Sequence, residues 1–583
     1  MAARTDVDVV VIGSGAGGLA AALALAQQGQ KVVVLEQHDV PGGWCHSFTL
    51  GGHRFSPGVH YIGELQPGGR MRKIYQGLGL GADLTFCELD PDGFDRVHVA
   101  GERLDFPKGR ENLVRRLQDR FPTERAGIQR YFDIVQSVSD DLDGMLNLTS
   151  LRDLLRLPGR AASIARWGVS SLETLFDHTV KSPRLRAFLA AQAGDHGLPP
   201  SLAPAAIHAA VSSHYFHGGW YPRGGAFTLP RAFVRGLKKA GGTIRLSAAV
   251  EKILVEKGRA IGVRLAGGEE IRAATVVSNA DPHATFRLVE KDQIPWTVRL
   301  RLGHSRYSTS ALSLFFATDM DLRAAGLSSA NVWNYTSDDL EATYQKGMTG
   351  WDPAKETSVP GLFLTCTTLK DPSKRVNGQH TLEAFTFVHH DAFKQWAGTH
   401  FGHRPEGYAA MKEVLSQKLL GGIDQIVPGL KDRITFRDLG TPLTNVHYLA
   451  ATEGNLYGTE KSRWQIGPWA WPLKTAIDGL WMCGASTVSH GVMGATISGL
   501  FAAKAILGVS VRELLTTKDK APEITCVPSE HPELWPEALR GRAEKMEPPA
   551  TYPTDLAAIA IAIAGAGAAA AGAGAAPSAK REH

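Results

Sequence analysis

The sequence predicts an α/β protein in which a doubly wound parallel sheet carries an inserted domain of mixed α+β structure. Three observations favour this fold class. Residues 7–12 form an apolar, β-branched run, a glycine-rich turn and an Ala/Leu-rich segment follow it, and a second apolar run covers residues 31–35. Continuous apolar runs are typical of buried parallel strands. The order strand, turn, helix, strand is that of a Rossmann-like βαβ unit.

The turn of this unit has the spacing G-x-G-x-x-G, formed by Gly13, Gly15 and Gly18. The first glycine permits the tight turn, the second lets a pyrophosphate approach the backbone, and the third lets helix and strand pack closely. The helix, expected over residues 17–28, presents free N–H groups and a positive dipole end to phosphates. Glu36 ends the second strand, 23 residues after Gly13, where it can accept hydrogen bonds from ribose hydroxyls. We therefore expect a bound dinucleotide.

Composition sets the broad class of the protein. A chain of 583 residues exceeds one ordinary core, so we expect two or three domains. The net charge of +5 is small and no Lys/Arg stripe is present, which argues against nucleic-acid binding. The five cysteines are scattered without ligand spacing, so we expect neither a zinc site nor a disulfide framework. The N-terminal MAARTDVD lacks an apolar segment, which favours a cytoplasmic location.

Four segments carry a more specific signal. They are "LEQHDVPGGWCHSFTLGGHRFSPGVHYIGE" from Leu35, "HYFHGGWYPRGGAFTLPRAFVRGLKKAGG" from His214, "TPLTNVHYLAATEGNLYG" from Thr441 and "GLWMCGASTVSHGVMGATISGLFAAKAI" from Gly479. Together they resemble the phytoene desaturase/carotenoid isomerase/retinol saturase group of flavoproteins, over about residues 6–508. The first and third segments look most like the retinol saturase branch.

This resemblance implies a discontinuous FAD-binding domain. It places the FAD pyrophosphate at the three glycines of the first turn, the adenine ribose at Glu36 and the flavin near Gly42 and Gly43. It also matches Val250 to a strand position whose backbone meets the adenine. The segment around Val250 alternates apolar and polar residues about a Lys257-Gly258 turn, so it is equally compatible with an ordinary hairpin.

The last cofactor segment departs from the common pattern of such flavoproteins. The resemblance leads us to expect Gly-Asp at the end of the last strand, where the Asp holds the ribityl chain, but the residues are Gly484-Ala485-Ser486. Ser486 or backbone N–H groups are the candidate substitutes. The helix that follows should begin near Gly491 and Val492 and point its N–H groups at the flavin, unless it is simply a tightly packed core helix.

The remaining sequence divides around the cofactor segments. The predicted FAD domain comprises residues 1–105, 219–290 and 440–510, and the predicted substrate domain comprises residues 106–218, mostly helical, and 291–439, with strands and helices. Inserts around a dinucleotide fold commonly enclose a substrate chamber. Residues 515–583 are predicted to be a linker followed by an Ala/Gly-rich tail.

Two features raise the question of peripheral membrane contact. Residues 556–576 carry no charge, but most are Ala or Gly, which predicts a flexible or weakly membrane-seeking tail rather than a true span. Arg152, Arg156, Arg160 and Arg166 lie among apolar residues, a pattern that fits a membrane surface or a solvated helix face.

Proton donors should lie in the segments that flank the flavin, because the flavin carries out hydride transfer itself. The candidate catalytic residues are Tyr221, His214 and Tyr457, with Tyr215, His60 and Tyr61 nearby; each is also compatible with a packing role. Arg223 is a candidate for orienting a polar group or for structural anchoring.

The resemblance implies an FAD-dependent oxidoreductase that acts on carbon–carbon double bonds of an apolar polyene or isoprenoid lipid, most similar to a retinol-saturase-like reductase. A carotenoid cis–trans isomerase or a phytoene-type desaturase is the first alternative. A flavin-retaining protein with a binding or redox-sensing role is an alternative of another class. No Ser/His/Asp arrangement supports a hydrolase, and nothing in the sequence indicates an oligomeric state.

Overall fold

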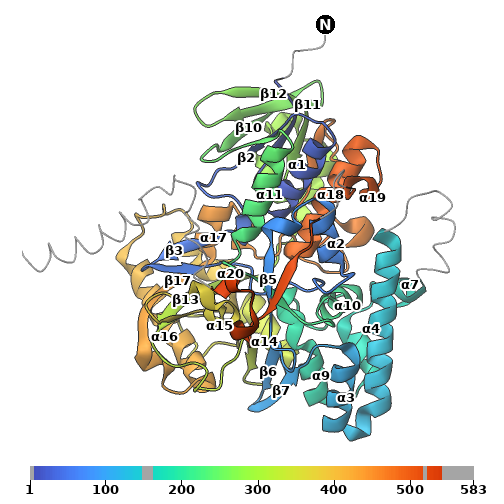
Figure 1. Cartoon of the computed structure of the whole chain (residues 1–583). Coiled ribbons are helices and arrows are strands. Elements are labelled where there is room, and N and C mark those ends of the chain that lie inside the picture. The colour runs from blue at the N-terminus through green and yellow to red at the C-terminus, as the bar shows by residue number, and fades with distance from the viewer. Residues whose placement is uncertain (1–5, 147–161, 517–521, 541–583) are drawn as a thin grey trace, which may run out of the picture.

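The structure is a computed structural model that describes residues 6–146, 162–516 and 522–540. Two seven-stranded sheets organise it, one toward the top and one toward the bottom of Figure 1. The first sheet has the strand order β10-β11-β12-β1-β2-β9, and β18 also pairs with β12. Its strands are β1 (Val7–Ile12), β2 (Val32–Leu35), β9 (Thr243–Arg245), β10 (Val250–Glu256), β11 (Arg259–Leu265), β12 (Glu270–Ser278) and β18 (Leu480–Met482).

The central strands of the first sheet are parallel. β1 pairs in parallel with β2 and β12, and β12 pairs in parallel with β18. The side chains of residues 9–12 in β1 are buried because helices cover one face of the sheet and the β10–β11 hairpin contributes to the core on the other face. The carboxyl ends of these strands therefore meet at one edge, which is where ligands bind in doubly wound folds.

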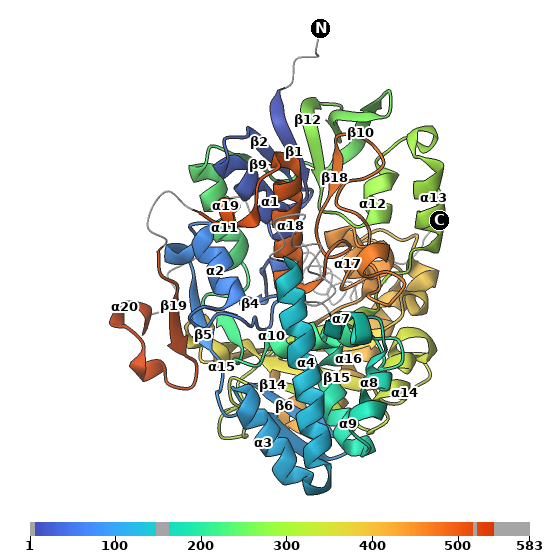
Figure 2. The same ribbon diagram turned by 90° about the vertical axis from the view of Figure 1, so that its right-hand side faces the viewer.

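Helices α1 (Ala16–Gln27) and α18 (Gly491–Leu507) pack closely against each other beside the first sheet (Figure 2). The close approach depends on small residues: a Cβ on Gly499 would lie 2.1 Å from the carbonyl oxygen of Gly17. Both helices match the predicted segments to within one residue. The hairpin of β10 and β11 also forms as predicted, with Lys257 and Gly258 at positive φ in the turn.

The second sheet has the order β17-β13-β16-β15-β14-β6-β7 and is antiparallel except for the β14–β6 pair. Its strands are β6 (Asp95–Val99), β7 (Glu102–Phe106), β13 (Ser310–Thr318), β14 (Asn331–Tyr335), β15 (Gly361–Cys366), β16 (His380–Val388) and β17 (Ile434–Gly440). Alternate side chains point to opposite faces of a strand. Leu362 and Leu364 of β15 therefore join the core under α16 (Glu406–Ile426), while Phe363 faces the other way, into the cavity described below.

Helices from the first predicted insert close the remaining side of the molecule, on the right of Figure 1. They include α3 (Arg110–Arg120), α4 (Arg125–Leu146), α7 (Ala162–Trp167), α8 (Leu172–Thr179), α9 (Pro183–Ala190) and α10 (Ala205–His214). Arg152, Arg156 and Arg160 lie outside the described residues.

Strand pairing refines the division of the chain. The sequence predicts that residues up to 105 belong to the cofactor domain, yet β6 pairs with β14 and β7 with β6, so both strands belong to the second sheet.

Part of the predicted linker also has a defined structure: β19 (Thr525–Pro528) pairs with β5 (Thr85–Glu88), which in turn pairs with β8 (Trp220–Pro222). Trp535 packs against this small sheet and is buried. The segment 556–576 lies outside the described residues.

Candidate active site

A cavity of about 820 Å3 extends from the carboxyl edge of the first sheet to the second sheet. One part of its wall comes from the β1–α1 turn, the loop after β2, β10, the end of β12 and the first turn of α18. The other part comes from α4, α10, β13, β15 and β16. The cavity therefore joins the two regions that the sequence predicts to bind cofactor and substrate.

The first glycine turn lines one end of the cavity. Gly13 has a φ of +87°, a conformation that glycine adopts without strain. Gly15 lines the cavity, and a Cβ there would lie 2.5 Å from Asn279 Nδ2. Gly18 does not line the cavity: a Cβ on it would meet the carbonyl oxygen of Gly13 at 2.2 Å, which is the close packing expected of the third glycine.

Glu36 lines the cavity at the end of β2, and it is held in place by three donors. The backbone N–H and hydroxyl of Ser14 donate to Glu36 Oε2 at 2.7 and 2.6 Å, and the His38 N–H donates to Oε1 at 2.9 Å. Val250 lines the same part of the cavity from β10. These positions suit a ribose and an adenine beside the glycine turn.

The Gly42-Gly43 loop folds back onto the first turn. Both glycines line the cavity at positive φ, and the Gly42 N–H donates to Ser14 Oγ at 3.0 Å. A Cβ on Gly43 would lie 3.2 Å from the Cα of Gly15. Two backbone turns without side chains thus face the cavity together.

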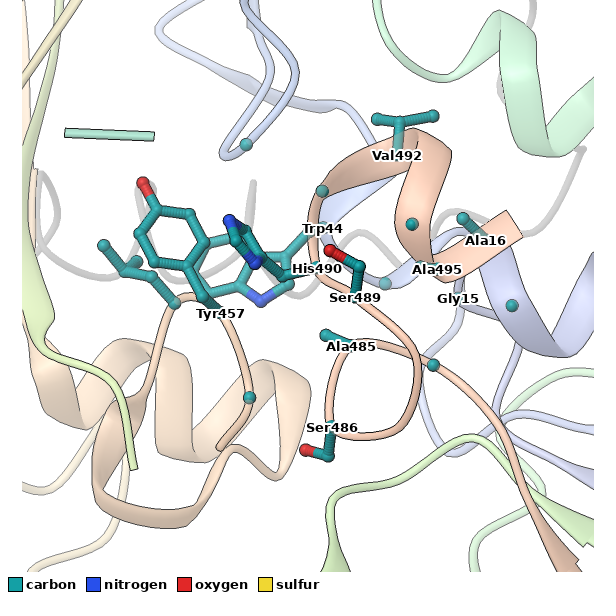
Figure 3. Close-up of a pocket in the computed structure, with 18 of the residues that line it drawn as sticks. Gly15, Ala16, Trp44, Tyr457, Ala485, Ser486, Ser489, His490, Val492 and Ala495 are labelled. Atoms are coloured by element: carbon teal, nitrogen blue, oxygen red, sulfur yellow. The ribbon is translucent and has the colours of Figure 1, made fainter. Parts of the chain in front are cut away.

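The residues after β18 form the third side of this region. Gly484, Ala485, Ser486 and Val492 all line the cavity (Figure 3). Ser486 Oγ accepts a hydrogen bond from the Thr459 N–H at 3.1 Å, and the carbonyl oxygen of Ala485 accepts one from Lys461 Nζ at 2.5 Å. Burial lowers the pKa of Lys461 to about 7. A buried lysine, rather than an aspartate, therefore supports this turn.

These features fit FAD. The first turns of α1 and α18 carry no side-chain cap and both open onto the cavity, close together in Figure 3. Uncapped helix N-termini leave N–H groups and a positive dipole end for anionic or electron-rich ligand atoms. Side chains are absent where a pyrophosphate must approach, and a carboxylate is present where a ribose would lie.

The wall formed by the second sheet and the helical insert is mainly apolar. Phe363 and Phe385 are direct partners on β15 and β16, with ring centroids 4.8 Å apart, and both line the cavity. Leu142 of α4, Ile164 of α7 and Val211 of α10 continue this wall. Such a chamber suits an apolar ligand.

His214 and Tyr457, two of the three catalytic candidates, line this cavity. The Gly63 N–H donates to His214 Nε2 at 2.8 Å, so the neutral ring carries its proton on Nδ1, which has no partner among the described residues. Burial lowers the pKa of His214 to about 4. The Tyr457 hydroxyl donates to the carbonyl oxygen of Gly194 at 2.8 Å.

Tyr221 lies outside the cavity lining. It is fully buried on β8, and its hydroxyl accepts a hydrogen bond from Lys374 Nζ at 3.0 Å. Arg223 lies near it, donates to the carbonyl oxygen of Leu539 at 2.8 Å and stacks over Trp535. The structure therefore places Arg223 in an anchoring position for the C-terminal segment. His60, Tyr61 and Tyr215 line the cavity.

The structure adds two cavity residues that the sequence analysis did not single out, Asp195 and His490. His490 immediately precedes α18, its ring lies 5.0 Å from that of Tyr457, and its Nε2 donates to the backbone carbonyl oxygen of Asp195 at 2.8 Å (Figure 3). Asp195 is the last residue of a short 3-10 helix, η4 (Ala191–Asp195), in the helical insert. No local pattern marks either residue, because only the fold brings these segments together.

Residues 6–146, 162–516 and 522–540 contain no group of His, Cys, Asp and Glu side chains arranged to hold a metal ion. None of their helices is both long and apolar enough to cross a bilayer.

Comparison with known proteins gives consistent matches. The family model described as flavin containing amine oxidoreductase matches residues 16–507. An all-trans-retinol 13,14-reductase from Danio rerio is 32% identical over 474 residues, covering 78% of each chain. The chloroplastic prolycopene isomerase 1 of an Oncidium hybrid cultivar is 28% identical over 515 residues, covering 85% of this chain and 83% of its own.

Solved structures agree on the fold. An oxidoreductase from Methanosarcina mazei superposes with a TM-score of 0.57 at 17% identity, covering 86% of this chain and 100% of its own. This similarity covers most of the chain, and it supports the predicted α/β architecture with an inserted domain.

Proposed function

Because the chain belongs to the family of flavin-containing amine oxidoreductases and is an FAD-dependent enzyme, we propose that it acts as a retinol-saturase-like reductase. In this reaction it reduces a carbon–carbon double bond of an apolar polyene. The observation that carries the proposal is the single cavity that runs from the glycine turn to the Phe363–Phe385 wall. Two relatives named as a retinol reductase and a prolycopene isomerase support the substrate class.

The described residues divide the work between binding and positioning. Bound FAD, in its reduced form, would supply a hydride. Gly13, Gly15 and the first turn of α1 would hold its pyrophosphate, and Glu36 would hold the ribose. The first turn of α18 would present N–H groups to the flavin. Lys461 supports the neighbouring turn by donating to the carbonyl oxygen of Ala485. Phe363 and Phe385 hold the substrate and exclude water.

An isomerase or a desaturase on the same scaffold is the second candidate, supported by the prolycopene isomerase relative. Incubation of the FAD-loaded protein with retinol and with carotenoids, under reducing and oxidising conditions, separates the alternatives by product mass. A reductase adds two hydrogens, a desaturase removes two and an isomerase leaves the mass unchanged. Bound FAD without any turnover would favour the redox-sensing alternative and contradict the proposal.

Peripheral membrane contact belongs to the same proposal. Trp296 and Leu300 of α13 (Trp296–His304), and Trp464 and Trp469 of the adjoining loop, are between 49% and 68% exposed. Arg301 joins these segments by donating to the carbonyl oxygens of Trp469 and Ala470. Trp469 also lines the cavity, so this patch would give a lipid substrate a path from a bilayer.

Liposome flotation tests this contact. We expect the protein to float with vesicles, and the double variant Trp464→Ser/Trp469→Ser to float several-fold less. Deletion of residues 541–583 distinguishes this patch from the tail. Wild-type protein that stays wholly in the soluble fraction would contradict membrane contact.

A further inference from the structure

A completely buried carboxyl group and a half-buried one share one tyrosine hydroxyl at the cavity wall. The Tyr61 hydroxyl oxygen lies 2.9 Å from Asp195 Oδ2 and 3.2 Å from Asp95 Oδ2. Asp195 and Tyr61 line the cavity, whereas Asp95 is completely buried on β6. The ring of Tyr61 is fixed by stacking on Tyr215, with centroids 4.1 Å apart.

Counting protons limits the charge that this group can carry. A tyrosine hydroxyl has one hydrogen, so it can donate to only one of the two carboxyl groups. The other contact becomes favourable only if that carboxyl group is itself protonated and donates to the tyrosine oxygen. Two carboxylates this close in a buried site do not both ionise easily. One of them therefore holds a proton.

The hydrogen bonds identify which one. Asp95 also accepts from Gln192 Nε2 at 2.9 Å and Asn331 Nδ2 at 2.8 Å, and both bonds favour its ionised form. Among the described residues, the Asp195 carboxyl group has no hydrogen-bond partner except Tyr61. Burial, and then the charge of Asp95, raise the pKa of Asp195 to about 8. Burial raises the pKa of Asp95 as well, but the bonds from Gln192 and Asn331 oppose that shift. Asp195 is therefore the group that holds the proton at neutral pH and donates to Tyr61, which donates to Asp95.

Two hydrogen bonds hold the backbone at Asp195 against the cofactor side of the cavity. His490 Nε2 donates to the carbonyl oxygen of Asp195, and the Tyr457 hydroxyl donates to that of Gly194, both at 2.8 Å. His490 directly precedes α18, whose first turn lines the flavin region of the cavity. These bonds connect the insert that carries Asp195 to the part of the wall that binds FAD.

The geometry points to Asp195 as the acid that protonates the substrate during double-bond reduction, with Tyr61 and Asp95 as its positioning residues. This inference rests on the proposed function. One carbon of the double bond receives a hydride, which bound reduced FAD supplies, and its neighbour receives the proton of Asp195. The O–H bond of Asp195 breaks, a C–H bond forms, and the substrate gains two hydrogens in total.

Tyr61 then stabilises the product state. Once Asp195 is a carboxylate, the Tyr61 hydroxyl can turn from Asp95 to Asp195, while Asp95 keeps its bonds from Gln192 and Asn331. Solvent returns the proton after the product leaves. His214 and His490 are poorer donors at neutral pH, because burial lowers the pKa of His214 to about 4 and that of His490 to about 3, which leaves both rings neutral.

The pH dependence follows from the groups around Asp195. A carboxyl group that must be protonated is active below its pKa and inactive above it, so the reduction should slow as the pH rises through about 8. The titratable and charged groups that face Asp195, directly or through Asp95, are Tyr61, Asp95, Tyr215, Tyr335, Tyr344, Tyr457, His490 and Lys370.

The first experiment does not require turnover. Infrared difference spectra between wild type and Asp195→Asn, recorded over a pH titration of the oxidised FAD-loaded protein, should contain a protonated-carboxyl band that disappears with a midpoint near 8. Absence of that band at neutral pH would overturn the inference. Its presence without polyene reduction would instead count against the proposed function alone.

The second experiment measures reduction of a retinol or carotenoid probe by the pre-reduced enzyme in a single turnover. Asp195→Asn should slow this step about 100- to 10,000-fold, the usual range for loss of a general acid, while FAD content and probe binding stay as in wild type. Tyr61→Phe should slow it less and move the high-pH limb upward, because the Tyr61 hydroxyl donates to Asp195 once Asp195 is ionised, and this bond lowers the pKa of Asp195.

Tyr131→Phe is the matched control. It removes another buried hydroxyl, 3.0 Å from His208 Nε2 and outside the cavity lining, and should leave the pH profile unchanged. Wild-type rates in Asp195→Asn would overturn the role of Asp195 while leaving the proposed function intact. A high-pH limb that Tyr61→Phe does not move would overturn the role of Tyr61.

Discussion

Around the expected cofactor the cavity wall is mainly backbone, whereas around the expected substrate it is mainly side chain. Glycines at positive φ and two uncapped helix N-termini face FAD. Aromatic and aliphatic side chains from α4, α10, β15 and β16 face the substrate, together with the Asp195–Tyr61–Asp95 group. The backbone surface suits the cofactor, which does not vary. The side chains around the substrate can change with the substrate without disturbing the cofactor site.

The largest effect is expected in the backbone half. Gly15→Val adds a side chain where the pyrophosphate must approach, and its Cβ would already lie 2.5 Å from Asn279 Nδ2. We expect FAD affinity to fall by at least about 100-fold, equivalent to about 2.7 kcal/mol, so that the protein purifies without flavin absorbance. Gly407→Val, at an open helical position of α16, is the control and should retain FAD. Full FAD occupancy in Gly15→Val would contradict the conclusion that the backbone of the glycine turn binds the cofactor.

A smaller effect is expected in the side-chain half. Phe363→Leu removes one ring of the Phe363–Phe385 pair, which is worth about 0.5–1.5 kcal/mol beyond its buried area. Substrate binding should weaken roughly 2- to 10-fold while the FAD-to-protein ratio remains that of wild type. Phe393→Leu, in the core beneath the far face of the second sheet, should change neither quantity. Loss of FAD from Phe363→Leu would show that the two halves are not separable.

The smallest effect on either half is expected at Tyr221. Tyr221→Phe leaves the buried Lys374 ammonium without its hydroxyl acceptor, so unfolding should require about 1–3 kcal/mol less free energy. FAD content and single-turnover reduction should stay at wild-type values because Tyr221 lies outside the cavity lining. The double variant Tyr221→Phe/Lys374→Met should recover part of the stability. A slowed reduction in Tyr221→Phe would restore this residue as a catalytic candidate.

The same contrast explains what the sequence could predict. The βαβ unit, the β10–β11 hairpin and α18 rest on short-range patterns, and their observed bounds agree with the predicted ones to within a residue or two. The cofactor site depends on these local units, so its glycines and Glu36 could be named. The match to the flavin-containing oxidoreductase family confirms the FAD cofactor.

The features that the sequence could not predict depend on contacts between segments that are far apart in the chain. Tyr61 and Asp195 are 134 positions apart, and Tyr61 and Asp95 are 34 apart, so no spacing rule brings them together. Membership of β6 and β7 in the second sheet is likewise decided by β14, more than two hundred residues later. Tyr221 belongs to a segment that resembles cofactor-flanking sequence, but its strand points its ring into packed protein rather than into the cavity.

The late position of α18 has a consequence for biosynthesis. A ribosome adds about 5–20 residues per second, so on the order of 20–90 s separate the synthesis of α1 from that of α18. During this interval the nascent chain has the glycine turn but lacks the helix that packs against it and completes the flavin pocket. Stable cofactor loading should therefore be post-translational, and premature termination anywhere before residue 507 would leave an exposed apolar surface as a target for chaperones and proteases.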